Sequence, residues 1–218
     1  MPELPDILLY IDRLRPRVVN QVLDQIIIRS PFVLRSVEPP LRSVVGKRVL
    51  GLRRMGKRIV FVLEDELFIA VHLMIAGRFR WMQEPKGAGK LLLASFKFPS
   101  GTLQLTEAGT KRRASIHLVA GEKGLRQFER GGLEVLDSDL TEFTRRLTSE
   151  NHTLKRALTD PRLFSGVGNA YSDEILHRAR LSPLALTGRL TEEQISTLFQ
   201  ATQNTLIDWI ERLQRETG

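Results

Sequence analysis

Hydrophobic and polar positions divide the chain into three regions. Apolar residues at spacings of three and four predict an amphipathic helix over residues 7–19, interrupted or ended near Pro16. From residue 26 to 119, short β-branched runs separated by turn residues predict strands. These runs are IIIRS, SVVGKRVLGL, RIVFVL, LFIAVHL, LLLASFKF, TLQL and SIHLV. Their number and spacing favour a β-sandwich.

The pattern becomes helical after Gly131 and Gly132. Helices are predicted over residues 140–147, 153–158 and 170–179, and from 191 to about 215. The glycine pair marks the expected domain boundary. We therefore predict an α+β chain in which residues 1–131 form a β-sandwich domain with flanking helices and residues 132–218 form an all-helical domain.

Composition narrows the classes of partner. The chain has 218 residues and a formal net charge of +8, with 33 Lys and Arg against 25 Asp and Glu. A sequence pI near 10.3 favours a polyanionic partner such as nucleic acid. There is no cysteine, which excludes disulfides and thiolate metal sites in this chain. No apolar run approaches the ~20 residues that span a bilayer, and acids near the amino terminus argue against a secretory signal. We expect an intracellular protein.

The amino-terminal residues Pro2 and Glu3 carry the first candidate chemistry. Removal of Met1 would leave Pro2 as a free secondary amine, which can condense with a sugar C1′ to give an iminium. Glu3 could then act as a general acid and base. On these residues alone, an ordinary tail leading into a helix explains the pattern better, since Pro and acids favour first helical turns.

Two basic segments are candidate nucleic-acid contacts. Arg53, Arg54, Lys57 and Arg58 place four cations within six residues, although a lysine at a strand edge is usually a solvated charge. Residues 106–114, TEAGTKRRA, are predicted to be a loop between two strands. This loop is either a solvated turn or a cationic finger that enters a groove or the space left by a flipped base.

The segment from residue 154 to 183 carries the most specific pattern. Asp160-Pro161 is expected to end one helix, Gly166 and Gly168 permit tight turns, and Asn169 is placed to cap the next helix. Backbone N–H groups at a helix start bind phosphate well. A helical hairpin with an Asn cap would explain the turn but not the surrounding cations.

Several segments together resemble the formamidopyrimidine-DNA glycosylase and endonuclease VIII family. PELPD, GLRRMGKRIVFVL, HLMIAGRFRW, TKRRAS and LFSGVGNAYSDEILHRARLSP occur in the family's order and span essentially the whole chain. The resemblance implies a β-sandwich joined to a helix-two-turn-helix domain, with damaged double-stranded DNA bound between them. It also implies removal of oxidised bases followed by strand cleavage at the abasic site, by a monomer in the cytoplasm or nucleoid.

The resemblance assigns roles to individual residues. Pro2 would be the Schiff-base nucleophile, Glu3 the proton donor, and Lys57 a phosphate contact and the acid in β-elimination. Asn169 would bind phosphate, and Lys155 would lie near the lesion or its phosphate. The full set of expected DNA contacts is His72, Ile75, Lys111, Arg112, Arg113, Lys155, Asn169 and Tyr171.

The chain departs from the family's pattern at several positions. Ile75, beside Met74, takes the place of the family's methionine that fills the space left by the flipped base. Arg112 resembles the family's arginine on the side of the orphaned base. Close to it, Ala114 stands where many members have an aromatic residue that acts as a wedge. Asp6 stands where glutamate is commoner. The family's four-cysteine zinc finger is missing, so we expect a shortened form that holds no cofactor and binds DNA less tightly.

Two alternatives remain. A noncatalytic module could recognise damaged DNA through the same surfaces without cutting it. An RNA-binding protein is favoured less, because RNA binding gives PELPD and Lys57 no task.

Overall fold

The structure, a computed structural model, describes residues 1–84, 89–109 and 111–217. The chain divides into two compact units. The sandwich unit contains Met1–Pro2 and Tyr10–Phe128, and the helical unit contains Glu3–Leu9 and Glu129–Gly218. Residues 3–9 thus join the helical unit, whereas a single linear boundary had been predicted.

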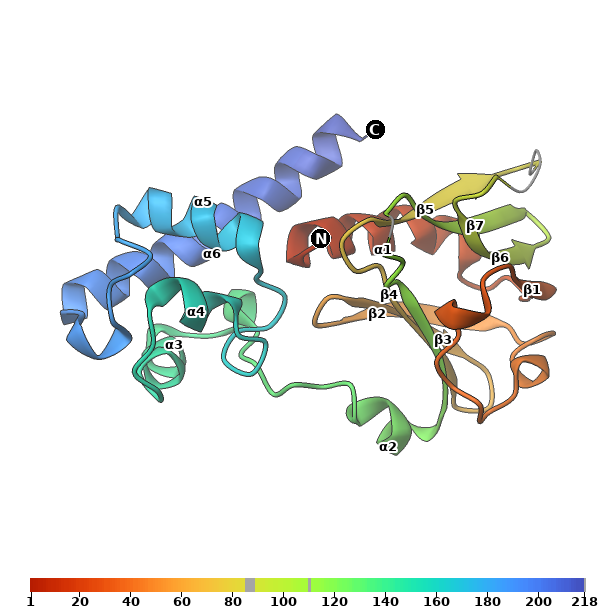
Figure 1. Cartoon of the computed structure of the whole chain (residues 1–218), viewed down its shortest axis with the longest axis horizontal. Coiled ribbons are helices and arrows are strands. Elements are labelled where there is room, and N and C mark those ends of the chain that lie inside the picture. Colours follow the sequence, from red (N-terminus) through yellow and green to blue (C-terminus); the bar gives the residue numbers. More distant parts are fainter. Residues whose placement is uncertain (85–88, 110, 218) are drawn as a thin grey trace. The chain divides into compact units, whose positions relative to one another are not determined.

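The sandwich unit contains two antiparallel four-stranded sheets (Figure 1). The first has the order β1 (Gln25–Ile28), β6 (Leu92–Phe98), β7 (Gly101–Glu107) and β5 (Gly77–Met82). The second has the order β2 (Val49–Met55), β3 (Arg58–Leu63), β4 (Leu67–His72) and β8 (Ser115–Ala120). The sheets and the helices together confirm the predicted α+β class.

Aromatic side chains join the two sheets. Phe61 of β3 stacks on Phe96 of β6 with ring centroids 6.0 Å apart, and its edge meets Phe79 of β5 at 6.3 Å. Tyr10 contacts Phe79 edge-on at 6.0 Å. All three phenylalanines are buried, so these contacts lie in the core of the sandwich.

The sequence analysis missed two elements of this unit. In β5, Phe79 is buried whereas Arg78 and Arg80 are exposed, which is the alternation of a half-buried strand. The short helix α2 (Gly121–Arg126) contains two glycines and has no side-chain cap, so its sequence carries little helical signal. The run SVVGKRVLGL was too long, because the strand begins only at Val49.

The helical unit contains the predicted helices α3 (Leu140–Leu147), α4 (Leu154–Thr159), α5 (Asn169–Ala179) and α6 (Glu192–Glu216) (Figure 1). Asp139 caps α3, and Thr191 with Gln194 forms a capping box at α6. Helix α1 (Leu4–Val18) starts in this unit, continues through Pro16 and ends two residues later. Short 3₁₀ turns lie at Pro31–Val33, Leu41–Ser43, Val135–Asp137 and Thr187–Arg189.

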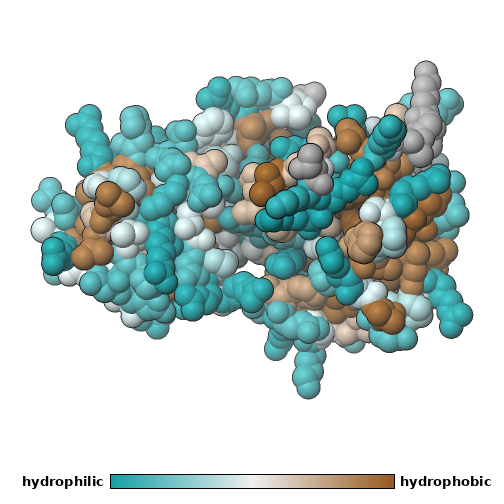
Figure 2. All heavy atoms as spheres, viewed as in Figure 1, coloured by the Kyte–Doolittle hydropathy of each residue, from teal (hydrophilic) through white to brown (hydrophobic). Residues whose placement is uncertain are grey.

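The core of the helical unit takes residues from both ends of its chain. Leu4 of α1 is buried with Phe143, Phe164, Ile175 and Leu198. The face of this unit visible in Figure 2 is mostly hydrophilic, as expected of surface helices. Among the described helices, none combines the length and the apolar character needed to cross a membrane.

Gly132 lies where two backbone segments meet. Leu133 donates its N–H to the Leu163 carbonyl at 2.9 Å, and Ser165 donates to the Leu133 carbonyl at 2.9 Å. A Cβ at position 132 would lie 2.4 Å from the Pro161 carbonyl oxygen. The glycine that marked the expected boundary therefore permits a close backbone contact.

We predict that Gly132→Ala destabilises the protein by about 1–3 kcal/mol, because neither backbone segment can move aside easily. Urea unfolding followed by circular dichroism measures the change. Gly51→Ala is the control, because a Cβ there meets nothing within 4 Å. Equal stability of the two variants would contradict the prediction.

Candidate functional site

The Glu3 carboxylate is enclosed by the start of α5. Its Oε2 accepts the N–H of Gly168 at 2.7 Å and of Tyr171 at 3.2 Å, and its Oε1 accepts the N–H of Ala170 at 3.0 Å. Glu3 is only 2% exposed. A carboxylate at this position satisfies otherwise unpaired N–H groups and complements the helix dipole.

Backbone contacts hold the residues next to Glu3. Leu4 donates its N–H to the Gly166 carbonyl at 3.0 Å, and Glu3 donates its own to Asp6 Oδ2 at 2.9 Å. Gly166 has φ +81°, a conformation that favours glycine. The predicted tight turn is therefore present, and it receives the amino-terminal segment.

The expectation that Asn169 caps α5 was wrong. Gly168 occupies the N-cap and provides no side-chain bond, and Asn169 is the first helical residue. The capping oxygens come from Glu3, far away in the sequence. The exposed Asn169 side chain is consequently not used in capping the helix.

Lys155 lies beside the same turn. Its Nζ donates to the Asn169 carbonyl at 2.8 Å and forms an ion pair with Asp173 Oδ1 at 2.6 Å. The Asp173 side chain is 69% exposed, so water screens this pair. Glu3, Lys155, Asn169 and Tyr171 are thus brought together within the helical unit.

Tyr171 is held in an apolar environment. It is 7% exposed, and its ring meets Trp209 of α6 edge-on with centroids 5.8 Å apart. Burial, followed by the nearby charges of Asp6, Glu3 and Glu174, raises the pKa of the Tyr171 hydroxyl. The phenol therefore remains protonated and can act as a hydrogen-bond donor.

Pro2 and Lys57 both belong to the sandwich unit. Pro2 is buried, whereas Lys57 is half-buried in the turn that joins β2 to β3. Met55 pairs with Arg58 across this turn, and Gly56 has φ +58°, as the first position of a type II′ hairpin requires.

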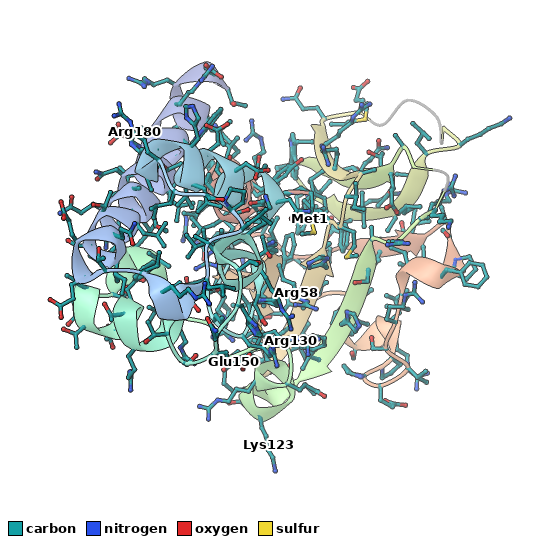
Figure 3. The ribbon with its side chains drawn as sticks, turned by 60° about the vertical axis from the view of Figure 1, so that its left-hand side comes forward. Met1, Arg58, Lys123, Arg130, Glu150 and Arg180 are labelled. Carbon is teal, nitrogen blue, oxygen red and sulfur yellow. The ribbon has the colours of Figure 1, made fainter. Side chains whose placement is uncertain are left out.

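The four-cation segment is divided between different tasks. Arg53 forms a two-pronged ion pair with Glu122 at 2.8 and 2.6 Å, and Arg54 donates to the Gly56 carbonyl at 2.8 Å. Arg58, which is labelled in Figure 3, begins β3 directly after the turn. Its guanidinium lies over the Phe128 ring, 5.3 Å from the centroid. Lys57 is therefore the member of the segment placed at the tip of the hairpin.

His72 ends β4 directly opposite Arg58. Burial, followed by the charges of Arg58, Lys57 and His117, lowers the pKa of His72 to about 4. Its Nδ1 is buried and has no hydrogen-bond partner among the residues that the structure describes. The ring is thus neutral near pH 7 and lies in a positive field.

The remaining candidates lie on two loops of the sandwich unit. Ile75 is 59% exposed, and Met74 beside it adopts a left-handed conformation. Lys111, Arg112 and Arg113 are exposed, and Arg112 Nη2 donates to the Lys90 carbonyl at 2.6 Å. Thr110, in the same predicted finger, lies outside the described residues.

Ala114 and Glu107 show how this second loop is held. Ala114 is only 3% exposed, and its N–H is bonded to the buried Glu107 carboxylate at 3.1 Å. The sequence analysis did not select Glu107. Its signal, an acid at the end of an apolar strand, is too common to distinguish a buried brace from a surface charge.

Two family profiles match the chain. The profile described as Formamidopyrimidine-DNA glycosylase N-terminal domain matches residues 1–116, and that described as Formamidopyrimidine-DNA glycosylase H2TH domain, for helix-two-turn-helix, matches residues 132–217. The chain belongs to the formamidopyrimidine-DNA glycosylase family. The resemblance inferred from the sequence motifs is confirmed.

Individual relatives agree with this assignment. A formamidopyrimidine-DNA glycosylase of Thermus thermophilus is 34% identical over 218 residues, covering 97% of this chain and 76% of the relative. One of Listeria monocytogenes is 30% identical over 216 residues, covering 95% and 78%. This level of identity extends along nearly all of the chain.

Solved structures show the same fold. The Lactococcus lactis family member, bound non-covalently to DNA containing an AP site, superposes with a TM-score of 0.88 at 26% identity, covering 96% of this chain and 82% of that one. The Thermus thermophilus protein gives a TM-score of 0.84 at 33% identity, covering 96% and 76%. Within the described part of this chain, no group of three or more His, Asp or Glu side chains could hold a metal.

We predict that Glu3→Gln lowers the free energy of unfolding by about 1–3 kcal/mol, because an amide group would turn a donor towards backbone N–H groups. Thermal and urea unfolding measure the loss. The exposed Glu211→Gln is the control, and a loss no larger than in this control would contradict the capping role.

We also predict that stability decreases as the pH falls from about 6.5 towards 4. The pKa of His72 is lowered in the folded chain, so the unfolded chain binds the proton first. Urea midpoints measured between pH 7 and pH 4 should change less in His72→Gln than in the wild type. Exposed His177→Gln should retain the wild-type dependence, and an unchanged slope in His72→Gln would overturn the prediction.

Proposed function

We propose that this chain excises oxidised bases from double-stranded DNA and then cleaves the strand at the resulting abasic site. The observation that carries the proposal is the buried carboxylate of Glu3, the residue directly after Pro2. Three backbone N–H groups at the start of α5 hold this carboxylate in place. A Schiff-base mechanism needs an amine nucleophile and an acid close to it. Pro2, once its nitrogen is a free secondary amine, and Glu3 would supply these two groups.

The proposed reaction begins after Met1 is removed. The neutral Pro2 nitrogen attacks the sugar C1′, the bond from C1′ to the base breaks, and its electron pair leaves with the base. The Pro2 nitrogen passes its proton to the departing base, so that its lone pair can form the C=N bond as the bond from C1′ to the ring oxygen breaks. Glu3 gives a proton to that oxygen, the ring opens, and an iminium joins Pro2 to C1′. Loss of a C2′ proton then expels the 3′ phosphate, with Lys57 as the acid in this β-elimination.

Backbone recognition would be divided between the units. In the sandwich unit, Lys57 lies at a hairpin tip near the neutral His72. In the helical unit, Lys155 and the exposed Asn169 lie at the start of α5, where phosphate binding is favourable. We propose residues 1–131 as the catalytic domain, with its segment 3–9 belonging to the helical unit, and 132–218 as the helix-two-turn-helix domain. The solved complex of the Lactococcus lactis relative with AP-site DNA supports a DNA partner.

The proposed DNA contacts on the loops have different tasks. The exposed Ile75 would fill the space left by the flipped base, while Lys111, Arg112 and Arg113 would face the opposite strand. Tyr171 would support the phosphate contact of Asn169 through its packing on Trp209.

A noncatalytic damaged-DNA-binding module is the second candidate. It is favoured wherever Met1 remains attached, because the Pro2 nitrogen is then a tertiary amide and cannot form an iminium. The intact mass of the purified chain therefore shows whether Met1 is attached or removed.

Borohydride trapping tests the proposal. Met1-processed protein is incubated with duplex DNA containing an oxidised purine or an abasic site, and sodium borohydride reduces the iminium to a stable adduct. We expect a covalent protein–DNA band for the wild type and for the surface control Glu211→Gln. Lys57→Ala should still form the adduct while cleaving the strand more slowly.

A variant that keeps Met1 attached should give no adduct. The glycosylase proposal fails if the processed wild type binds the damaged duplex but is never trapped, a result that favours the noncatalytic module. It also fails if the Met1-retaining form is trapped as well as the processed one.

A further inference from the structure

Glu107, the last residue of β7, is an almost completely buried acid outside the catalytic pair. It is 1% exposed. Its Oε1 accepts the Arg113 N–H at 3.0 Å, and its Oε2 accepts the N–H groups of Arg113 at 2.9 Å and Ala114 at 3.1 Å. Its partners are therefore backbone groups of the loop that carries Lys111, Arg112 and Arg113.

This contact fixes two successive peptide groups. A buried carboxylate is costly unless hydrogen bonds replace its water, and here both oxygens serve as acceptors. The backbone of Glu107 is itself held, because its N–H donates to the Leu91 carbonyl at 3.0 Å and it pairs with Gly77 across β5. Glu107, which holds the loop, is thus itself held by the sheet rather than by another loop.

The residues that Glu107 holds differ in exposure from one position to the next. Ala114 is 3% exposed, directly before β8 begins at Ser115, so its side chain is turned inward. Arg112 and Arg113 are exposed immediately before it. On the neighbouring loop, Ile75 presents an apolar side chain that is 59% exposed.

We propose that Glu107 is a positioning residue for recognition of the strand opposite the lesion. By holding the peptides of Arg113 and Ala114, it directs the arginines outward and keeps position 114 out of the DNA. Ile75 then fills the vacated space without an aromatic partner from this loop. The inference rests on the proposed DNA-repair function and extends it to a residue that does not touch DNA.

Binding measurements test the inference independently of catalysis. Fluorescence anisotropy gives the Kd for duplexes in which a stable abasic-site analogue faces C, A, G or T. Glu107→Gln keeps the size of the side chain but turns a donor towards the loop N–H groups. The ratio of the Kd of the weakest-bound duplex to that of the tightest-bound duplex should therefore shrink by about tenfold. Arg112→Ala should reduce the same ratio, and Glu107→Ala should resemble Arg112→Ala.

Two controls separate positioning from loss of folding. Glu66→Gln changes an exposed glutamate of the same unit and should retain the wild-type ratio. Trapping of a single-stranded abasic oligonucleotide, which has no opposite base, should proceed within about twofold of the wild-type rate in Glu107→Gln, because the reacting groups are untouched.

Ala114→Phe provides a test that does not depend on any Glu107 variant folding. If position 114 faces inward, the larger side chain lowers the melting temperature and does not restore DNA affinity to Ile75→Ala. Restored DNA affinity in the Ile75→Ala, Ala114→Phe double variant would overturn the inference. So would a folded Glu107→Gln variant whose ratio of Kd values between the four duplexes equals that of the wild type. Absence of a trapped adduct in the wild type would instead count against the proposed function.

Discussion

The hydrogen bonds between Glu3 and the first turn of α5 determine the arrangement of the helical unit. A helix start leaves N–H groups without partners, and a buried carboxylate needs partners of its own, so each group satisfies the other. This contact brings Leu4 into the helical core and attaches the chain start to the turn at Gly166. It also frees Asn169 from capping, which leaves its amide group exposed at the start of the helix.

The sandwich unit handles charge in a different way. Burial, followed by the charges of Arg58, Lys57 and His117, lowers the pKa of His72 and keeps its ring neutral. Arg53 and Arg54 are engaged with Glu122 and Gly56. Buried acids act on the backbone in both units, Glu3 at a helix start and Glu107 at a loop. In each case a carboxylate fixes peptide groups while the neighbouring polar side chains remain exposed.

Local patterns were sufficient to predict the helices and most of the strands. Periodicity of three and four located α3 to α6, because each of these helices buries one face in a shared core. An alternation with a period of two marks β5, in which the buried Phe79 lies between the exposed Arg78 and Arg80. The alternation of buried and exposed residues in β5 is therefore a local signal of a strand. These residues were interpreted only as part of the motif HLMIAGRFRW.

The errors at the candidate site have a different origin. Asn169 has the residue type of an N-cap, and nothing near it in sequence shows that Glu3 will take that role from the other end of the chain. Likewise, Glu107 cannot be distinguished from a solvated acid until the loop folds back onto it. Long-range hydrogen bonds are the part of the site that single-sequence patterns do not encode.

The position of Glu3 also bears on the order in which the chain is made. Residues 3–9 are synthesised before the sandwich strands, yet they belong with residues 129–218, which are synthesised after those strands. The sandwich strands are therefore synthesised while this segment still lacks its partners. Leu4 and Ile7, buried in the finished protein, must remain exposed or find temporary cover until α5 is complete.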